Sequence, residues 1–386
     1  MHIGFDISQT GTGKAGCGYY AHALARALLE LAPQHHYALY PGFGDFYFDP
    51  HMPLRNPYPG RDVHYGPRHL SRDAAAEFWN TTGLDEALGH PDIVHANNFW
   101  CPVTLRGARL VYTLHDLGFV TDAAWSTEEN RIGCFDGVFR AALAADWIVA
   151  VSEASRRQFL DYFPHFPPDR VRVIHPCSRF TGAQIAGEPP QVLRDRAQPG
   201  RFWLSVGTIE PRKNQIRLAE AYARYLAQSG ADAMPLVLAG GTGWRMEDFS
   251  ARLQALGIAD RVILTGYVSD AELVWLYRHC YANLYPSLFE GFGLPVLEGM
   301  QFGAPTLSSD STSLPEVAGG AAWLLPPHDV ACWSAALSRL AAAPHEREAM
   351  AARSLAQAAR FDWQHSAAAL LALYEEALVQ PRRAVW

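Results

Sequence analysis

Short runs of apolar and β-branched residues alternate with amphipathic stretches along almost the whole chain. In the first half these runs predict strands at residues 2–7, 37–40, 92–96, 109–114, 146–151 and 170–175. The runs are apolar on both faces, which is typical of strands in a buried parallel sheet. Between them, stretches with helical periodicity predict helices at residues 19–31, 72–88, 129–143 and 153–162. Residues 41–67 are rich in loop-forming residues. The alternation of strands and helices in the N-terminal half predicts a doubly wound α/β domain.

Residues 178–200 interrupt this alternation with glycines and prolines that follow no period, so we predict a linker at residues 181–200. The pattern then restarts, with strands predicted at residues 202–207, 235–240, 261–266, 282–287, 304–309 and 321–326. Helices are predicted at residues 215–228, 247–256, 270–279, 295–302, 331–343, 345–360 and 363–379. We therefore expect two Rossmann-like, parallel-sheet domains, residues 1–180 and 201–362, that face each other across a cleft. Ligands of such sheets bind beyond the carboxyl ends of the strands.

Composition narrows the class of protein. A chain of 386 residues is long for a single core, which agrees with two domains. Its formal net charge of −7 gives no general attraction to nucleic acid or to an acidic membrane surface. The six cysteines are scattered without a CxxC pair or a zinc-ligand spacing, so they are expected to be reduced thiols. With no apolar run of membrane-spanning length and no signal peptide, the expected location is the cytoplasm, with at most peripheral membrane contact.

The first candidate loop, QTGTGKAGCG (residues 9–18), contains the pattern G-x-G-x-x-G after a predicted strand. A dinucleotide-binding fingerprint would need an acidic residue at the end of the second strand. That strand ends at Tyr40, and the nearest acid, Asp45, lies inside a loop. A P-loop needs Ser or Thr after its lysine, whereas Lys14 is followed by alanine. Two interpretations of the loop remain: a tight turn without a ligand, or backbone that approaches a phosphate or a sugar.

The second candidate loop is SVGTIEPRKNQ (residues 205–215), which leads from a strand into a helix. Arg212 and Lys213 would lie at the N-terminus of that helix, where two cations oppose the macrodipole unless an anion is present. One interpretation is a pair of solvated surface cations. The other is a phosphate held by both cations and the helix amides.

The third candidate segment is YPSLFEGFGLPVLEGM (residues 285–300). Glu290 precedes a Gly-Phe-Gly turn, Pro295 fits the first turn of a helix, and Glu298 would lie one turn further on. The turn predicts an anion-binding nest formed by the backbone amides of Phe292, Gly293 and Leu294. A carboxylate can accept hydrogen bonds from a vicinal diol. Hydroxyl-binding groups on either side of a phosphate-binding nest suit a nucleotide sugar.

Several segments taken together resemble a known family. Residues 282–318 resemble the E-x7-E region of the retaining glycosyltransferase family four, in particular bacterial mannosyltransferase-like members. The segments VGTIEPRKN, LTGYVSDAELVWLY, LVYTLHDL and IVAVSEASRRQF are similar to further parts of that family, in the same order along the chain. The resemblance covers nearly the whole chain. It implies the GT-B fold, with residues 363–386 forming a helix that crosses back to the N-terminal domain.

The resemblance also implies roles for the donor-binding residues. Glu298 would bind the ribose hydroxyls of the donor, and Glu290 the hydroxyls of the transferred sugar. The amides of Phe292, Gly293 and Leu294 would bind the distal phosphate, while Lys213 and Arg212 would neutralise the pyrophosphate. The base would be held at Gly266–Val268, so that Gly266 and Val268 are donor-site candidates.

In the N-terminal half the resemblance implies that His115 lies beside the donor sugar and the reacting centre. Glu290, His115 and Lys213 are therefore the candidate catalytic residues. Gly16 and Gly18 would bring backbone close to the phosphate and the acceptor.

Two positions depart from the family pattern. Thr208, also in the donor site, stands where many relatives carry an arginine, so Arg212 is expected to take over that role. The segment that often reads Asn-Gly-Val-Asp is HPCS (residues 175–178) here, which weakens any donor contact expected from that loop.

The expected activity is the transfer of a sugar, with retained anomeric configuration, from GDP-mannose or a UDP-sugar to a glycan or lipid-linked acceptor in cell-surface polysaccharide synthesis. The chain has no D-x-D triplet, so no metal is expected. No cofactor is expected either, because the nucleoside diphosphate sugar is a co-substrate. For the family, the resemblance implies front-face attack, in which Glu290 positions the sugar and is not a nucleophile. Asn97, Asn98 and Trp100 are acceptor candidates, although Trp100 suits the core equally well. The alternatives are an NAD-dependent oxidoreductase, a nucleotide-sugar hydrolase or epimerase, and a scaffold without activity.

Overall fold

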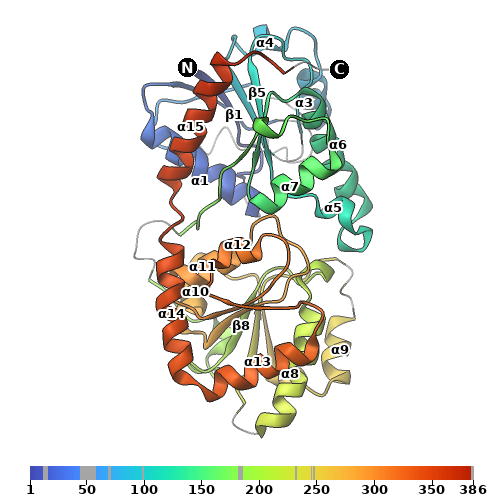
Figure 1. The fold of residues 1–386 in the computed structure, drawn as a ribbon, viewed down its shortest axis with the longest axis vertical. Helices are drawn as coiled ribbons and strands as arrows, with labels where there is room; N and C mark the ends of the chain where they lie inside the picture. The colour runs from blue at the N-terminus through green and yellow to red at the C-terminus, as the bar shows by residue number, and fades with distance from the viewer. Residues whose placement is uncertain are drawn as a thin grey trace. The chain divides into compact units, whose positions relative to one another are not determined.

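The computed structural model describes residues 1–11, 16–43, 58–67, 71–97, 100–180, 186–230, 233–244, 246 and 248–383, with only the backbone of Arg72. Its contacts divide the chain into two compact units. Unit 1 comprises Met1–Arg179 and Asp362–Trp386, and unit 2 comprises Phe180–Phe361. Each unit is built around its own parallel sheet (Figure 1).

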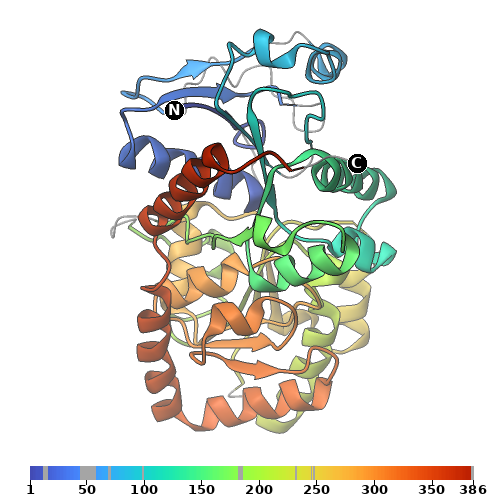
Figure 2. The ribbon, with the colours of Figure 1, turned by 45° about the horizontal axis from the view of Figure 1, so that its top comes forward.

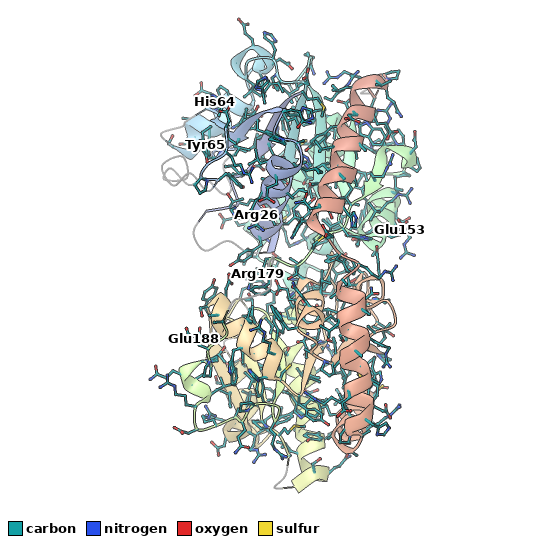
Figure 3. The ribbon with its side chains drawn as sticks, turned by 90° about the vertical axis from the view of Figure 1, so that its left-hand side faces the viewer. Arg26, His64, Tyr65, Glu153, Arg179 and Glu188 are labelled. Carbon is teal, nitrogen blue, oxygen red and sulfur yellow. The ribbon has the colours of Figure 1, made fainter. Side chains whose placement is uncertain are left out.

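The sheet of unit 1 has seven parallel strands in the order β3-β2-β1-β4-β5-β6-β7. They are β1 (His2–Asp6), β2 (His36–Tyr40), β3 (His64–Tyr65), β4 (Ile93–Asn97), β5 (Arg109–Leu114), β6 (Trp147–Ala150) and β7 (Val171–Val173). Strand β3 is the one that the sequence pattern missed. It is only two residues long and forms the edge of the sheet beside β2 (Figure 3). Two residues carry no recognisable period, so β3 was assigned to a loop.

The helices of unit 1 are α1 (Gly16–Leu31), α3 (Arg72–Trp79), α4 (Leu84–Ala87), α5 (Gly118–Thr121), α6 (Glu128–Ala144), α7 (Glu153–Tyr162) and α15 (Trp363–Val379). Helices α1 and α15 pack together on one side of the sheet, and α6 and α7 lie on the other side (Figures 1 and 2). The single helix predicted at residues 72–88 was wrong. The chain leaves α3 at Asn80, and Gly83, with φ 80°, starts the separate helix α4.

The sheet of unit 2 has six parallel strands in the order β10-β9-β8-β11-β12-β13. They are β8 (Trp203–Val206), β9 (Leu236–Ala239), β10 (Val262–Gly266), β11 (Ala282–Tyr285), β12 (Thr306–Ser309) and β13 (Trp323–Leu325). Alternate residues of these strands point to opposite faces, as the pleat requires. Trp203 is buried in the cluster that contains Leu218, and its neighbour Leu204 in the cluster that contains Val274.

The helices of unit 2 are α8 (Gln215–Ser229), α9 (Phe249–Ala255), α10 (Asp270–His279), α11 (Leu294–Gln301), α12 (Leu314–Ala318), α13 (Val330–Ala342) and α14 (Pro344–Ala358). The described part of the predicted linker, residues 186–200, belongs to unit 2 and is not a bare connection. Leu193 is buried in the core, and the amide of Glu188, labelled in Figure 3, donates to the carbonyl of Ala271. Among the described residues, no helix is long and apolar enough to cross a bilayer.

The strand order of unit 2 creates a topological switch point. Strand β8 lies between β9 and β11, so the connection after β8 leads to one side and β11 continues on the other. The loops that follow β8 and β11 are therefore neighbours at the carboxyl edge of the sheet, where ligands of open α/β sheets bind. The first of these loops carries Arg212 and Lys213, and the second carries Glu290.

Candidate active site

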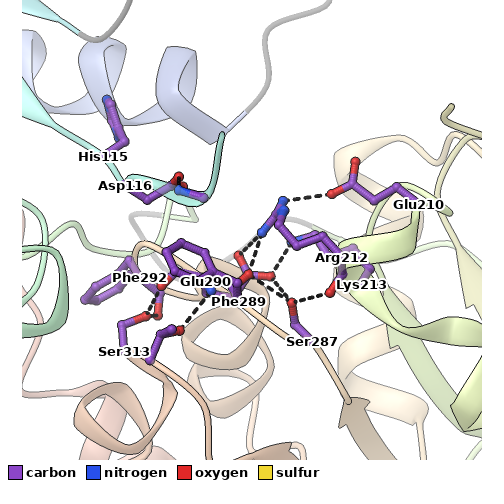
Figure 4. Close-up of polar contacts among 12 residues, drawn as sticks. His115, Asp116, Glu210, Arg212, Lys213, Ser287, Phe289, Glu290, Phe292 and Ser313 are labelled. Carbon is purple, nitrogen blue, oxygen red and sulfur yellow. Dashed lines mark hydrogen bonds and ion pairs between the residues drawn. The ribbon is translucent and has the colours of Figure 1, made fainter. Parts of the chain in front are cut away.

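Glu290 lies between two cations from the loop after β8 (Figure 4). The Lys213 Nζ atom is 2.7 Å from Glu290 Oε1, and one terminal nitrogen of Arg212 is 3.0 Å from Glu290 Oε2. Each carboxylate oxygen thus faces its own positive charge. The sequence predicted these three residues as parts of one site, but as ligands of different parts of a donor and not as direct partners.

Two further side chains complete this network, and the sequence reasoning missed both. Ser287 Oγ donates to Glu290 Oε1 at 2.6 Å, and the Tyr285 hydroxyl donates to the same oxygen at 3.0 Å. The Tyr285 hydroxyl also accepts a hydrogen bond from Lys213 Nζ at 2.6 Å. Tyr285 is the last residue of β11, and Ser287 follows two residues later, shortly before Glu290. Polar side chains at the carboxyl end of a parallel strand are the signal that could have identified both residues.

The backbone of Glu290 is fixed by residues that follow β12. Its amide donates to Thr312 Oγ1 at 2.9 Å, and Ser313 Oγ lies 2.9 Å from its carbonyl oxygen. Thr312 has φ 49°, a left-handed conformation that is uncommon for a residue with a branched side chain. The side chain and the backbone of Glu290 are therefore both held in one geometry.

The charges of the network shift each other's protonation. Burial alone would raise the pKa of Glu290, but Arg212 and Lys213 outweigh this effect and lower the pKa from 4.5 to about 2. Burial lowers the pKa of Lys213, and the attraction of Glu290 partly opposes that change. Burial, reinforced by the Glu290 charge, raises the pKa of Tyr285 well above its ordinary value. At neutral pH the carboxylate is ionised and the phenol carries its proton.

Arg212 is oriented by further contacts within the same loops. One of its terminal nitrogens donates to Glu210 Oε1 at 2.8 Å, and the other donates to the Phe289 carbonyl at 2.7 Å. Glu210 is buried. Its carboxylate was not identified from the sequence as a second partner of Arg212. Thr208 is exposed nearby, and its carbonyl accepts from Gln215 Nε2 at 2.9 Å. The substitution of Arg212 for an arginine at position 208 stays a prediction.

Helix α11 begins at Leu294, one residue before the predicted start, and ends at Gln301. Gly293 is its N-cap with φ 111°, a conformation that favours glycine. A Cβ atom at Gly293 would lie 2.6 Å from Leu314 Cδ2, so the buried Leu314 would have to move to admit a side chain. The turn therefore places the amides of Phe292, Gly293 and Leu294 at the helix N-terminus, as the anion-nest prediction requires.

Glu298 lies one turn into α11 and is buried. Its Oε2 accepts a hydrogen bond from the hydroxyl of Tyr277 in α10 at 3.2 Å, a partner that the sequence did not indicate. The segment predicted to bind the base, Gly266–Val268, begins at the last residue of β10. Gly266 has φ 69° and its carbonyl accepts from the amide of Gly240, while Val268 is half-buried.

His115 follows β5 in unit 1. Burial lowers the pKa of its imidazole to about 4, so the ring is neutral at neutral pH. Its Nε2 atom is buried and has no hydrogen-bond partner among the residues that the structure describes. The ring packs at right angles to that of Tyr20, with a centroid distance of 5.1 Å. A buried ring nitrogen without a partner suits a group that meets a ligand.

The glycine loop of unit 1 is described only in part, because Gly13 and Lys14 lie outside the described residues. Gly16 is exposed as the first residue of α1, and Gly18 is buried in the first turn of that helix.

The acceptor candidates have different surroundings. Asn97 is buried at the end of β4, and its Nδ2 donates to the Asp6 carbonyl at 2.9 Å. Its Oδ1 has no partner within the described part of the chain. Asn98 lies outside the described residues. Trp100 is buried in the core with the Arg140 guanidinium 4.4 Å from its ring, which favours the core interpretation. Asp6, which the sequence reasoning passed over, lies beside Asn97, and burial raises its pKa to about 7.

Comparison with known proteins identifies the family of this chain. Residues 15–177 match the glycosyltransferase family 4 model, and residues 195–356 match the group 1 glycosyl transferases. The O-antigen chain mannosyltransferase B of Escherichia coli is 34% identical over 279 residues, which are 71% of this chain and 71% of the relative. The serotype-specific mannosyltransferase WbdA of Escherichia coli is 29% identical over 402 residues, covering 95% of this chain but 47% of that longer protein.

Solved structures agree with the fold. The crystal structure of HepE from Anabaena in complex with UDP and glucose superposes with a TM-score of 0.68 at 16% identity. The superposition covers 97% of this chain and 100% of HepE. The predicted pair of Rossmann-like, parallel-sheet domains is confirmed. On the sequence matches, this chain belongs to glycosyltransferase family 4.

Proposed function

We propose that this chain is a retaining, metal-independent mannosyltransferase that uses a nucleoside diphosphate sugar in cell-surface polysaccharide synthesis. The observation that carries the proposal is the network of Lys213, Arg212 and Glu290 at the switch point of unit 2, beside the N-terminus of α11. The mannosyltransferases among its relatives support mannose and an O-antigen-like glycan. GDP-mannose is the first donor to test, and UDP-sugars are the second.

The negatively charged diphosphate of the donor would be bound by the partial positive charges of helix amides and by the full positive charges of two side chains. The amides of Phe292, Gly293 and Leu294 would hold the distal phosphate, because the first amides of a helix lack partners within it. Lys213 and Arg212 would neutralise the charge that develops on the leaving diphosphate. These two cations supply the positive charge, so no metal or cofactor is needed in this scheme.

The carboxylates would bind hydroxyl groups at the two ends of the donor. Glu298 would take the ribose, and Gly266 and Val268 the base. Glu290 would bind the transferred sugar. Its carboxylate is a poor nucleophile in this geometry, because hydrogen bonds and ion pairs engage both oxygens and its pKa is about 2. Retention would therefore follow front-face attack, with the leaving phosphate taking the proton of the acceptor hydroxyl.

In unit 1 the neutral imidazole of His115 would bind a sugar hydroxyl through its unpaired Nε2 atom. Gly16 and Gly18 would bring backbone to the phosphate and acceptor. The Oδ1 atom of Asn97, to which no described residue donates, would accept from an acceptor hydroxyl, with Asn98 as a neighbouring candidate. The acceptor would be a glycan or a lipid-linked glycan, which an enzyme in the cytoplasm would meet at the inner face of the membrane.

The experiment is an assay of sugar transfer with purified protein, a short mannan acceptor and GDP-, UDP-, dTDP- or ADP-sugars, with and without EDTA. We expect release of nucleoside diphosphate only when donor and acceptor are both present, and no loss of rate with EDTA. Lys213→Ala should lower the rate at least 100-fold, whereas the exposed Arg252→Ala should keep it. Release of free sugar without an acceptor would favour a hydrolase, and loss of rate with EDTA would contradict metal independence.

A further inference from the structure

Helix α6 carries apolar residues on the side that packs against the sheet and also on an adjoining, exposed side. The side that packs against the sheet of unit 1 carries small or medium residues, which are buried in the core: Cys134, Val138, Ala141 and Ala142. The other side carries larger residues that are 64, 47, 43 and 40% exposed: Ile132, Phe135, Phe139 and Leu143. A helix that only covered a sheet would bury its largest apolar side chains. The outer stripe therefore indicates a surface that another molecule covers.

The four residues of this α6 stripe form one continuous surface. Their spacing of three, four and four residues places them along a single side of the helix. At the centre, the rings of Phe135 and Phe139 stack with a centroid distance of 5.6 Å and an interplanar angle of 13°. Beside them, Arg140 Nε lies 2.8 Å from Asp136 Oδ2, so one positive and one negative charge flank the aromatic pair.

We propose that the α6 stripe is the docking surface for a second copy of this chain, with the two α6 helices antiparallel about a twofold axis. The pattern of the stripe is self-complementary. With the axis between residues 137 and 138, Ile132 faces Leu143 of the partner subunit, and Phe135 comes within one residue of Phe139 of the partner subunit along the helix. The same axis brings Asp136 within one residue of Arg140 of the partner subunit. An isologous interface needs this kind of symmetry, in which one patch is its own complement.

The charges around the stripe favour a protein over a lipid surface. Between residues 128 and 144 the helix has three acidic side chains, Glu128, Glu129 and Asp136, against two arginines. One of these, Arg131, donates its Nε hydrogen to the Phe119 carbonyl at 2.9 Å. Helices that lie on anionic membranes carry an excess of Lys and Arg on the polar side. A second copy supplies both the apolar contact and the opposite charges, which the headgroups of an anionic bilayer do not.

Dimer formation is tested by sedimentation velocity of the full chain from low to high micromolar concentration. The proposed interface is small, because each subunit contributes four apolar side chains and one charge pair. We therefore expect a reversible dimer with a dissociation constant in the micromolar range. Phe135→Glu and Phe139→Glu should each sediment as monomers at every concentration, with unchanged circular dichroism. The matched control is Leu355→Glu, because Leu355 is 51% exposed on α14 and should leave the dimer intact. A wild-type chain that stays monomeric throughout overturns the proposal.

Disulfide trapping tests the geometry without adding a charge to the stripe. Ile132→Cys and Leu143→Cys proteins, mixed and oxidised, should give a covalent dimer that contains one of each. Neither protein alone should exceed the wild-type background, since antiparallel helices keep identical end positions apart. Efficient cross-linking of Ile132→Cys to itself contradicts the antiparallel axis. Binding of a monomeric wild-type chain to phosphatidylglycerol vesicles, lost in Phe139→Glu, would assign the stripe to a membrane instead.

Discussion

Lys213 Nζ and Glu290 Oε1 lie 2.7 Å apart, although 77 positions separate the two residues in the sequence. Their side chains are only 14 and 9% exposed. The pair forms because β8 and β11 are neighbours in the sheet, so the loops after both strands meet at one edge. The candidate centre is therefore a buried cluster of opposite charges.

Glu290 is expected to support both activity and stability. Glu290→Ala should lower turnover at least 100-fold, and it should cost about 3–5 kcal/mol because two buried cations lose their counter-charge. Glu290→Gln retains hydrogen-bond acceptors for Ser287 and Lys213, so its loss of stability should be smaller. Urea unfolding and nucleoside diphosphate release measure the two effects. Glu220→Ala, which breaks an exposed pair with Arg252, is the control and should cost less than about 1 kcal/mol. Near-normal activity of Glu290→Ala would remove the residue from the site.

The same carboxylate predicts a loss of stability in acid. Its pKa is about 2 in the folded chain against an ordinary value of 4.5, so the unfolded chain binds the proton more readily. The stabilisation is thus fully present above pH 4.5 and is lost as pH falls towards 2. A shift of this size corresponds to about 3 kcal/mol. Acid titration of the unfolding free energy should show this slope in the wild type and a flatter one in Glu290→Gln. Equal slopes would contradict the assigned pKa.

Two histidines in unit 1, the buried His95 and the half-buried His115, predict a separate effect at higher pH. Burial lowers the pKa of His95 to about 3 and of His115 to about 4, against an ordinary 6.5. The unfolded chain therefore takes up protons that the folded chain does not, and stability falls as pH drops from 6.5 towards 4. His95→Gln and His115→Gln should each reduce the steepness of that fall, measured by thermal unfolding between pH 7 and pH 4. If neither substitution changes the slope, the histidines are protonated in the folded chain.

The C-terminal helix is expected to be tied to the sheet of unit 1 through Tyr374. Its hydroxyl lies 2.5 Å from His95 Nδ1, and His95 Nε2 lies 2.7 Å from Thr113 Oγ1. Tyr374→Phe would leave a buried imidazole nitrogen without a partner, at a cost of about 1–3 kcal/mol. Tyr162→Phe, at a residue that is half exposed on α7, is the matched control and should be nearly neutral. Similar melting curves for the two variants would contradict the role of this hydrogen bond.

The turn before α11 is expected to tolerate only glycine. Gly293→Ala places a Cβ in a left-handed conformation and 2.6 Å from Leu314 Cδ2, so both strain and a clash displace the helix start. Gly257→Ala is the control for strain alone, because Gly257 has φ 67° and open space around it. The control should cost about 1 kcal/mol and keep nucleotide binding. Gly293→Ala should cost more and weaken nucleoside diphosphate binding in calorimetry. Equal affinities would show that the turn does not hold the phosphate.

The sequence predicted the parts of the fold that have a strong local pattern. Strand β5 and helix α15 match their predicted ranges, because β5 is a nearly continuous apolar run and the apolar positions of α15 recur along the whole helix. Strand β3 was missed because two residues have no period, and α3 was extended too far because Gly83 was taken as part of a helix. Both errors arise where a turn or a sheet partner decides the conformation.

The candidate site was predictable only where its chemistry is local. The Gly-Phe-Gly turn and the first turn of α11 lie within a few residues of each other, and the turn chemistry alone indicated an anion nest. The partnership of Glu290 with Lys213 depends on strand order, which the sequence pattern does not contain. Likewise, no local signal told which apolar side of α6 faces the core, because both sides carry hydrophobic residues.

The most direct test of the account is nuclear magnetic resonance of a reaction that contains the purified chain, GDP-α-mannose and a mannan acceptor. We expect GDP to appear in step with a new α-linked mannose, and neither product to form with Glu290→Ala. A β-linked product would contradict retention. Absence of any transfer from GDP-, UDP-, dTDP- or ADP-sugars to the acceptor would contradict the proposed function itself.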